Sequence, residues 1–270
     1  MTSYGRFFSH ILFALVLFGQ MLSISSGYCK TAEEKGLQIA READWRDDGF
    51  GNYTAEMTMT LKNKQGKESK RSIRTKTLEV PGDGDKSLSI FDTPKDVRGT
   101  AFLTFSHKVG DDEQWLYLPA LKRVKRINSK NKSGSFMGSE FAYEDIASQE
   151  VEKYTYKYTG KDEYHGQLCF VVESYPVDKK YSGYTKRVSW LDTKEYRLQK
   201  IEFYDRKKSL LKTLTVGDYQ LYLEKFWRPD TMSMVNHQTG KSTVLNWTDY
   251  TFQTGLTDKD FNSTSLKRVR

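Results

Sequence analysis

The chain has 270 residues, of which 37% are hydrophobic and 14% aromatic, including 17 Tyr and 15 Phe. A chain of this size fits one large β domain, and the aromatic excess favours strands because aromatic side chains suit a half-buried, pleated surface. The net charge is +8, but the positive residues are spread along the chain. This spread is typical of a solvated surface and argues against a basic arm that binds nucleic acid.

Residues 1–29 have the layout of a secretory signal peptide. A basic start precedes the apolar run Ile11–Phe18, and small residues follow up to Gly27. The uncharged stretch nearly reaches the ~18–20 residues of a membrane-spanning helix, but its Ser- and Gly-rich second half favours cleavage, after Gly27 or after Cys29, over a retained anchor. Tyr28 stands where a lipidation signal needs a small residue, which disfavours a lipid anchor on Cys29. We therefore expect an exported protein, which again argues against nucleic acid as a partner.

Residues 30–270 are predicted to form a single β-rich domain that begins with one short helix. Thr31 and Glu34 have capping-box spacing at the helix start. The period then changes to two, because every odd position of Tyr53–Leu61 is apolar and every even one polar. Further strands are predicted at Glu68–Val80, Ser87–Phe91, 100–108, 113–118, Tyr154–Gly160, Gln167–Tyr175, Lys186–Leu191, Leu198–Tyr204, Leu210–Val216, Gln220–Leu223, Thr231–His237 and Thr243–Phe252. Strands at this spacing, joined by short turns, predict an antiparallel meander that curls into a barrel or half-barrel.

One long segment, Lys122–Ile146, interrupts this rhythm, and long insertions in hairpin-rich folds are often functional. We expect a loop with a short helix near Ser139–Ile146. The segment begins with the basic residues Lys122, Arg123, Lys125 and Arg126 and ends with the apolar residues Phe136, Met137, Phe141, Tyr143 and Ile146. The basic cluster fits contact with an anionic headgroup or membrane surface. Its alternation with Val124 fits an ordinary strand with a solvated face equally well.

No pattern in the sequence points to catalysis, a metal or a cofactor. His107, His165 and His237 lie far apart, and none has the spacing of a metal-binding pair. There is no nucleophile elbow, phosphate loop or dinucleotide fingerprint. Cys169 stands alone in a strand-like run and is expected to be a small buried hydrophobe without a disulfide. We therefore predict a protein that is not an enzyme.

The apolar stripes of the predicted strands are the remaining signal. One helix cannot cover a sheet of this size, so the inner face of a curled sheet either packs solidly or encloses a cavity. The inner-face candidates are large, adaptable side chains at period two: Met57, Met59, Leu103, Phe105, Trp115, Tyr117, Met232, Met234, Leu245 and Trp247. Such residues most often form ordinary core. As a group beside an apolar loop they favour a site for flexible acyl chains, which are recognised by shape and apolar area.

The block Arg98–Ile146 resembles the signature of the outer-membrane lipoprotein-sorting protein family in the LolA/LolB-like superfamily. The similarity continues through Lys186–Asp205 to Phe261–Arg268. Its most specific residues are Trp115, Pro119, Arg126 and the run Phe136-Met-Gly-Ser139. Glu140 and Ala142 stand where Asp and Ser are usual in the family, and both changes are mild. The resemblance implies a mainly β (α+β) fold: an unclosed, strongly curved antiparallel sheet, or half-barrel, with a few helices covering the concave side.

The resemblance also implies a periplasmic carrier of lipids or lipidated proteins toward the outer membrane. An RND-type exporter or an outer-membrane acceptor is the implied partner, with transient membrane contact. We expect the apolar cavity to be lined by Met57, Met59, Leu103, Phe105, Trp115 and Tyr117 under a movable cover of Phe136, Met137, Phe141 and Tyr143. Two other hypotheses stay open: an exported interaction module that docks on an exporter complex without a ligand, and a hydrolase, which would need clustered acids or a Ser/His pair inside the cavity.

Overall fold

The fold is built on a single sheet of thirteen strands in a computed structural model that describes residues 30–264 and 266–268. The strands are β1 (Asn52–Lys62), β2 (Glu68–Leu78), β3 (Lys86–Thr93), β4 (Ala101–Phe105), β5 (Glu113–Leu118), β6 (Arg123–Ile127), β7 (Tyr154–Tyr164), β8 (Gln167–Pro176), β9 (Tyr184–Asp192), β10 (Leu198–Asp205), β11 (Leu210–Tyr222), β12 (Phe226–Asn236) and β13 (Ser242–Phe252). Their order across the sheet is β6-β5-β4-β3-β2-β1-β13-β12-β11-β10-β9-β8-β7. The predicted signal peptide and its cleavage after Gly27 or Cys29 lie outside the described residues.

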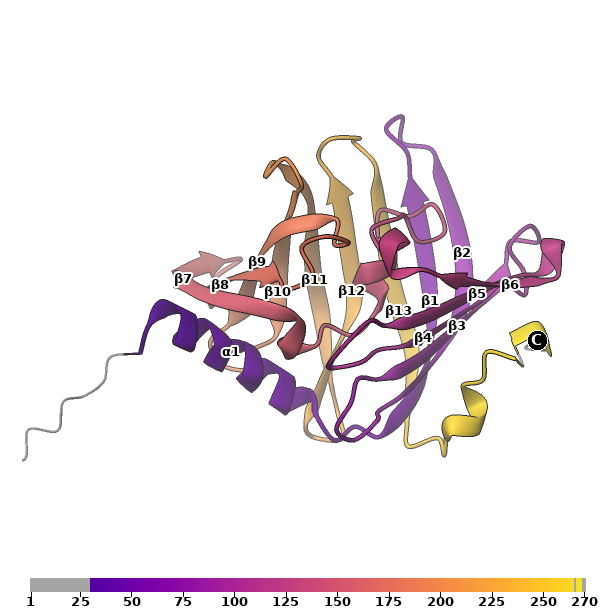
Figure 1. Cartoon of the computed structure of the whole chain (residues 1–270), viewed down its shortest axis with the longest axis horizontal. Helices are drawn as coiled ribbons and strands as arrows, with labels where there is room; N and C mark the ends of the chain where they lie inside the picture. The colour runs from indigo at the N-terminus through magenta and orange to yellow at the C-terminus, as the bar shows by residue number, and fades with distance from the viewer. Residues whose placement is uncertain (1–29, 265, 269–270) are drawn as a thin grey trace, which may run out of the picture.

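The sheet is antiparallel throughout and unclosed. Every neighbouring pair of strands runs antiparallel, and the edge strands β6 and β7 do not pair with each other. Figure 1 shows the sheet curving strongly, with β6 and β7 on opposite sides of the molecule and the chain between them running inside the curve. The predicted half-barrel is therefore confirmed.

Helix α1 (Ala32–Asp47) begins where the capping-box spacing predicts. The Glu34 amide donates to Thr31 Oγ1 at 3.1 Å, and the Thr31 amide donates to Glu34 Oε2 at 2.9 Å. The helix packs against β7 at Gly36, where a Cβ atom would lie 2.8 Å from the backbone nitrogen of Tyr158. Only glycine allows this approach. Among the described residues, no helix has both the length and the apolar character needed to span a bilayer.

The two faces of the sheet carry separate apolar clusters. The concave cluster takes residues from both halves of the sheet, β1 to β6 and β9 to β13, and from the chain between β6 and β7. It comprises Met57, Met59, Ile73, Phe91, Phe102, Leu116, Ile127, Phe136, Phe141, Tyr184, Ile201, Phe203, Leu214, Val216, Met234 and Leu245. The convex cluster lies on the opposite face of β3 to β5 and comprises Leu88, Ile90, Ala101, Leu103, Phe261 and Leu266. Phe261 and Leu266 belong to the C-terminal segment, which lies outside the curve (Figure 1).

The structure differs from the predicted elements in four places. The segment Lys122–Ile146, expected to be a loop with a short helix, begins with an edge strand, β6, which pairs with β5. The predicted strands Leu210–Val216 and Gln220–Leu223 are one strand, β11, because its pairing with β12 continues past Gly217 to Tyr222. Strand β7 likewise continues beyond Gly160, through an irregularity in its pairing with β8. The predicted helix near Ser139–Ile146 is reduced to α2 (Tyr143–Ile146), since the preceding residues form a tight turn.

Candidate functional site

The chain between the edge strands, residues 128–153 and here called the crossing segment, covers the concave face. Its Phe136 and Phe141 side chains are 1% and 3% exposed. The Phe136 ring lies 4.9 Å from that of Phe102, and the Tyr143 ring lies 5.6 Å from Phe102 (centroid to centroid). These aromatic residues therefore bury the apolar surface that the curved sheet would otherwise expose.

Residues 136–141, here called the tip of the crossing segment, form a tight turn that points both phenylalanines inward. The Phe136 amide donates to the Phe141 carbonyl at 2.7 Å, and Ser139 Oγ donates to the Phe136 carbonyl at 2.7 Å. Met137 has a φ of 51° and Gly138 a φ of 77°. Left-handed backbone is costly for a non-glycine residue such as Met137, so the contacts around it hold this turn in place.

A few polar contacts fasten the tip to the sheet. The Glu140 amide donates to Thr243 Oγ1 at 3.0 Å, and Asn236 Nδ2 donates to Glu140 Oε2 at 2.7 Å. Arg71 Nη1 donates to the Met137 carbonyl at 2.6 Å. Lys212 Nζ also donates to the Glu140 carbonyl, at 2.8 Å. These hydrogen bonds hold the tip against β2, β11, β12 and β13.

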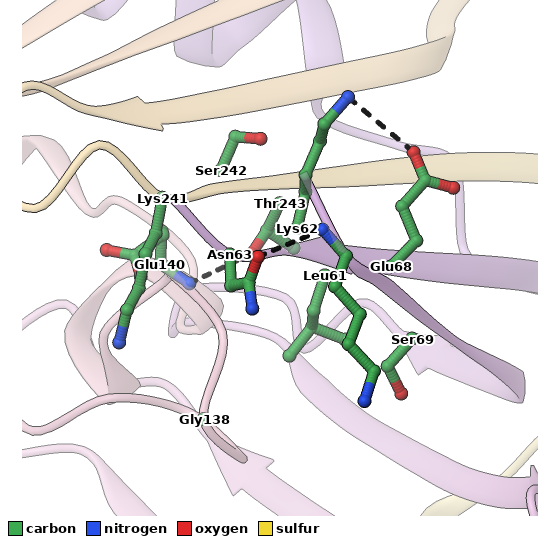
Figure 2. Close-up of a pocket in the computed structure, with 11 residues that line it drawn as sticks. Leu61, Lys62, Asn63, Glu68, Ser69, Gly138, Glu140, Lys241, Ser242 and Thr243 are labelled. Atoms are coloured by element: carbon green, nitrogen blue, oxygen red, sulfur yellow. Dashed lines mark hydrogen bonds and ion pairs between the residues drawn. The ribbon is translucent and has the colours of Figure 1, made fainter. Parts of the chain in front are cut away.

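Two hollows flank the tip. One, of about 240 Å³, lies between the β1–β2 turn, the start of β13 and the tip at Gly138 and Glu140 (Figure 2). The other, of about 410 Å³, lies between the tip and strands β9 to β12 and is lined in part by Tyr184 and Lys212. Glu140 lines both hollows. The part of the chain that covers the concave face thus has free space on either side.

Two buried cations lie beneath α2. The Arg187 side chain is 1% exposed and that of Lys212 is 4% exposed. Lys212 Nζ lies 2.7 Å from Asp145 Oδ2, and an Arg187 Nη2 atom lies 3.8 Å from carboxylate oxygens of Glu144 and Asp145. Tyr184 Oη also donates to Asp145, at 2.9 Å. The concave face beneath α2 therefore combines an apolar surface with a buried charged cluster.

The predicted cavity residues divide between the two faces. Met57 and Met59 belong to the concave cluster, with Met232 and Trp247 packed against it. Leu103 belongs to the convex cluster, as do the partly buried residues that pack on it, Phe105, Trp115 and Tyr117. The prediction that these last four residues line the same cavity as Met57 is therefore wrong. In β4 and β5 the concave face carries Phe102 and Leu116 instead. Each lies one residue away from a predicted position, and successive side chains of a strand point to opposite faces.

The predicted cover residues lie together. Phe136 and Phe141 are in the concave cluster, and Met137 and Tyr143 pack against it. Their role as a movable cover stays a prediction. Sequence reasoning missed Phe102 and Leu116, which continue the alternation of β4 and β5 on the concave side. They were recognisable only once the faces of those strands were known.

The basic residues Lys122, Arg123, Lys125 and Arg126 lie at the sheet edge and are exposed. Val124 packs against the convex cluster, and Arg126 Nη2 donates to Glu113 Oε1 at 2.6 Å. Neighbouring Leu121 is 64% exposed. Charged residues on an edge strand also prevent pairing with other chains. Headgroup contact by these residues stays a prediction.

Within the described residues, no three His, Cys, Asp or Glu side chains are grouped to hold a metal ion. Cys169 is buried and makes no disulfide, and burial raises the pKa of its thiol. His107 Nδ1 lies 2.7 Å from Asp83 Oδ2, and this hydrogen bond is the main reason that the pKa of Asp83 falls to about 2. This pair joins the turn before β3 to the turn after β4.

Two acids near this turn make stability depend on pH. Burial, reinforced by Glu150, raises the pKa of Asp85 to about 7, and burial raises that of Glu150 to about 6. Between the unfolded value of 3.8 and these folded values, the folded state binds more protons than the unfolded state, so stability falls as pH rises from about 4 to 7. Asp85→Asn is expected to increase the free energy of unfolding at pH 8 by on the order of 1–3 kcal/mol and to flatten the profile.

Denaturant melts at pH 5 and pH 8 measure this effect. Asp83→Asn is the matched control because the pKa of Asp83 is shifted in the opposite direction. It should lower stability at pH 8. An Asp85→Asn protein with the same slope between pH 5 and pH 8 as the wild type would contradict the assignment.

Comparisons with known proteins give a consistent result. A family profile described as "Uncharacterized protein" matches residues 83–268. A crystal structure of an outer membrane lipoprotein-sorting protein domain from Vibrio parahaemolyticus matches with a TM-score of 0.86 and 60% identity over 87% of this chain and 100% of that one. A DUF1329 family protein from Desulfovibrio piger matches with a TM-score of 0.83 and 28% identity over 88% and 100%.

A LolA superfamily protein from Nitrosomonas europaea matches with a TM-score of 0.67 over 87% of this chain and 98% of that one. At 21% identity it shows a shared fold. No functionally curated protein matches the chain.

Proposed function

Because the chain belongs to the outer-membrane lipoprotein-sorting family of LolA-like proteins, we propose that it carries a lipid or lipoprotein by sheltering acyl chains against its concave face. The observation that supports this proposal best is the concave cluster, which continues across both halves of the sheet. Its cover is a single stretch of chain that includes Phe136 and Phe141.

An acyl chain would take the place of these aromatic side chains. Burial of hydrocarbon contributes about 0.8 kcal/mol per methylene, so a long chain offsets the loss of the Phe136 and Phe141 contacts. Lifting the tip breaks its hydrogen bonds to β2, β11, β12 and β13, which bonds to water replace, and the flanking hollows give it room. A small free-energy gap between covered and uncovered states also allows release at the acceptor.

We place this activity in the periplasm, after export and removal of residues 1–29. The family membership and the signal-like sequence support this location. The exposed edge residues Leu121, Lys122, Arg123, Lys125 and Arg126 would give transient contact with anionic lipid. An RND-type exporter or an outer-membrane acceptor would be the protein partner, and the proposal assigns no catalytic step to the chain.

Titration with a fluorescent long-chain fatty acid tests the proposal. We expect saturable uptake with about one ligand per chain and displacement by unlabelled lipid. An increase in the thermal midpoint on binding should follow, since a ligand that binds only the folded state stabilises it. No uptake by protein that has been extracted free of lipid would contradict the carrier role.

The alternative is an exported interaction module without a ligand. One observation favours it: the concave face is filled by the protein's own residues, with Phe136 and Phe141 almost fully buried. Under this hypothesis the crossing segment is permanent core. The same titration separates the two functions, because a permanently filled interior takes up no fatty acid.

A further inference from the structure

Two cationic side chains, Arg187 and Lys212, lie next to each other among apolar residues. Arg187 on β9 and Lys212 on β11 are both register partners of Phe203 on the intervening strand β10. Phe203 belongs to the concave cluster and is 1% exposed. The Arg187 guanidinium carbon lies 5.4 Å from the centre of the Phe203 ring, and Lys212 Nζ lies 5.2 Å from it. The pair therefore lies on the concave face and not at its rim.

The counter-charges of this pair come from the crossing segment. Within the described residues, Arg187 forms ion pairs only with Glu144 and Asp145 of α2, and Lys212 only with Asp145. The acids are themselves buried, at 8% and 4% side-chain exposure. The sheet thus holds two cations, while the element that covers the sheet holds the matching anions.

Arg187 is poorly satisfied in this arrangement. Its three guanidinium nitrogens are buried and form no hydrogen bond with the described residues. Both carboxylates lie 3.8 Å away, which is too long for a hydrogen bond. Tyr154 and Tyr184 flank the guanidinium, with ring centres at 5.0 and 5.1 Å. A planar donor group with unused N–H groups suits the bidentate recognition of carboxylate or phosphate oxygens.

A hollow reaches Lys212 and Tyr184 of this cluster, while Arg187 does not line it. The cavity of about 410 Å³ beside the tip is also lined by Arg206, Lys207, Ser133 and Ser135. Asp205 and Glu140 also line it. A polar group bound at Lys212 would therefore face this hollow, while an attached chain would lie along the apolar face.

We propose that Arg187 and Lys212 form the receptor for an anionic lipid headgroup, a carboxylate or a phosphate, and that Glu144 and Asp145 occupy it as internal substitutes when no ligand is bound. This inference rests on the proposed carrier function and specifies its ligand class. When an acyl chain replaces the crossing segment, it buries the two cations again. A neutral lipid leaves them without partners, which is costly in an apolar environment, whereas an anionic headgroup replaces the lost carboxylates.

Ligands that share one chain but differ in headgroup test the inference. Palmitate, palmitoyl lysophosphatidic acid and monopalmitoylglycerol are compared as competitors of a fluorescent fatty acid, with inorganic phosphate as a separate arm. The two anionic lipids should bind at least roughly tenfold more tightly than monopalmitoylglycerol, the order expected for charge-assisted hydrogen bonds. Lys212→Gln should reduce this preference, and Asp145→Asn should increase it by freeing the receptor.

The two variants separate a binding role from a structural one, because a merely structural change would weaken all three lipids together. Lys186→Gln is the control: its residue neighbours Arg187 on β9 but forms an ion pair with Glu173, at 2.7 Å. Equal binding of anionic and neutral lipids by the wild type would overturn this inference and leave the carrier function intact. Failure of every lipid to bind would overturn both. Saturable binding of inorganic phosphate that does not compete with lipid would overturn the assignment to a lipid headgroup.

Discussion

Covalent attachment of the crossing segment to β13 is expected to abolish acyl-chain uptake, and reduction is expected to restore it. The attachment uses the double variant Glu140→Cys/Thr243→Cys. The Glu140 amide and Thr243 Oγ1 are 3.0 Å apart, so the two residues are in direct contact between the tip and β13. With the tip fixed, Phe136 and Phe141 cannot leave the concave face, so the site for the chain stays filled.

The oxidised protein should bind fluorescent fatty acid at least roughly 100-fold more weakly than the reduced protein, because the open state is no longer accessible. The two single-cysteine variants serve as controls and should bind equally well under both conditions. Cys169 is fully buried and does not compete for the disulfide. Equal uptake by the oxidised and reduced double variant would show that the crossing segment does not cover the site.

Removal of the Phe136 ring is expected to change stability and uptake in opposite directions. Phe136 is 1% exposed and lies against Phe91 and Phe102. Phe136→Ala should therefore lower the free energy of unfolding by about 3–5 kcal/mol. The same change destabilises the covered state relative to the open state, so the apparent affinity for fatty acid should rise by at least roughly tenfold.

Phe261→Ala is the matched control for this variant. Phe261 is equally buried, at 3% exposure, but belongs to the convex cluster. Its removal should lower stability by a similar amount and leave uptake unchanged. Chemical denaturation and ligand titration of the two variants measure both quantities. A parallel effect of the two substitutions on uptake would mean that the concave face has no special role.

The sequence was most informative where local physical rules decide the structure. The Thr31 capping box placed the start of α1, and the alternation in Tyr53–Leu61 placed β1 and its buried methionines. These signals are contained within a few neighbouring residues. The strand spacing predicted an antiparallel meander that curls into a barrel or half-barrel. Its unclosed form followed from the family resemblance, since closure depends on pairing between distant segments, as β1 pairs with β13.

The face of a short strand was harder to predict. Strand β4 is apolar on both sides, because Phe102 contacts the crossing segment while Leu103 contacts the C-terminal segment. Alternation cannot identify the inner face when both faces are buried. The choice of Leu103, Phe105, Trp115 and Tyr117 therefore placed four residues on the wrong side of the sheet.

The charged cluster could not be predicted at all. Arg187 and Lys212 are 25 positions apart in the chain and meet across Phe203 only through the register of β9, β10 and β11. Their partners, Glu144 and Asp145, come from the crossing segment. In the sequence, each of these residues has the appearance of an ordinary surface charge. Only the fold shows that they are buried together.

Photolabelling with a palmitate analogue that carries a diazirine on its chain shows where a bound acyl chain lies on the protein. After irradiation and proteolysis, mass spectrometry identifies the labelled residues. We predict labels on residues of the concave cluster, such as Met59, Phe102 and Met234, and their loss on addition of unlabelled palmitate. Labels confined to the convex cluster around Leu103 and Phe261, or spread over the surface without competition, would contradict the claim that the concave face shelters an acyl chain.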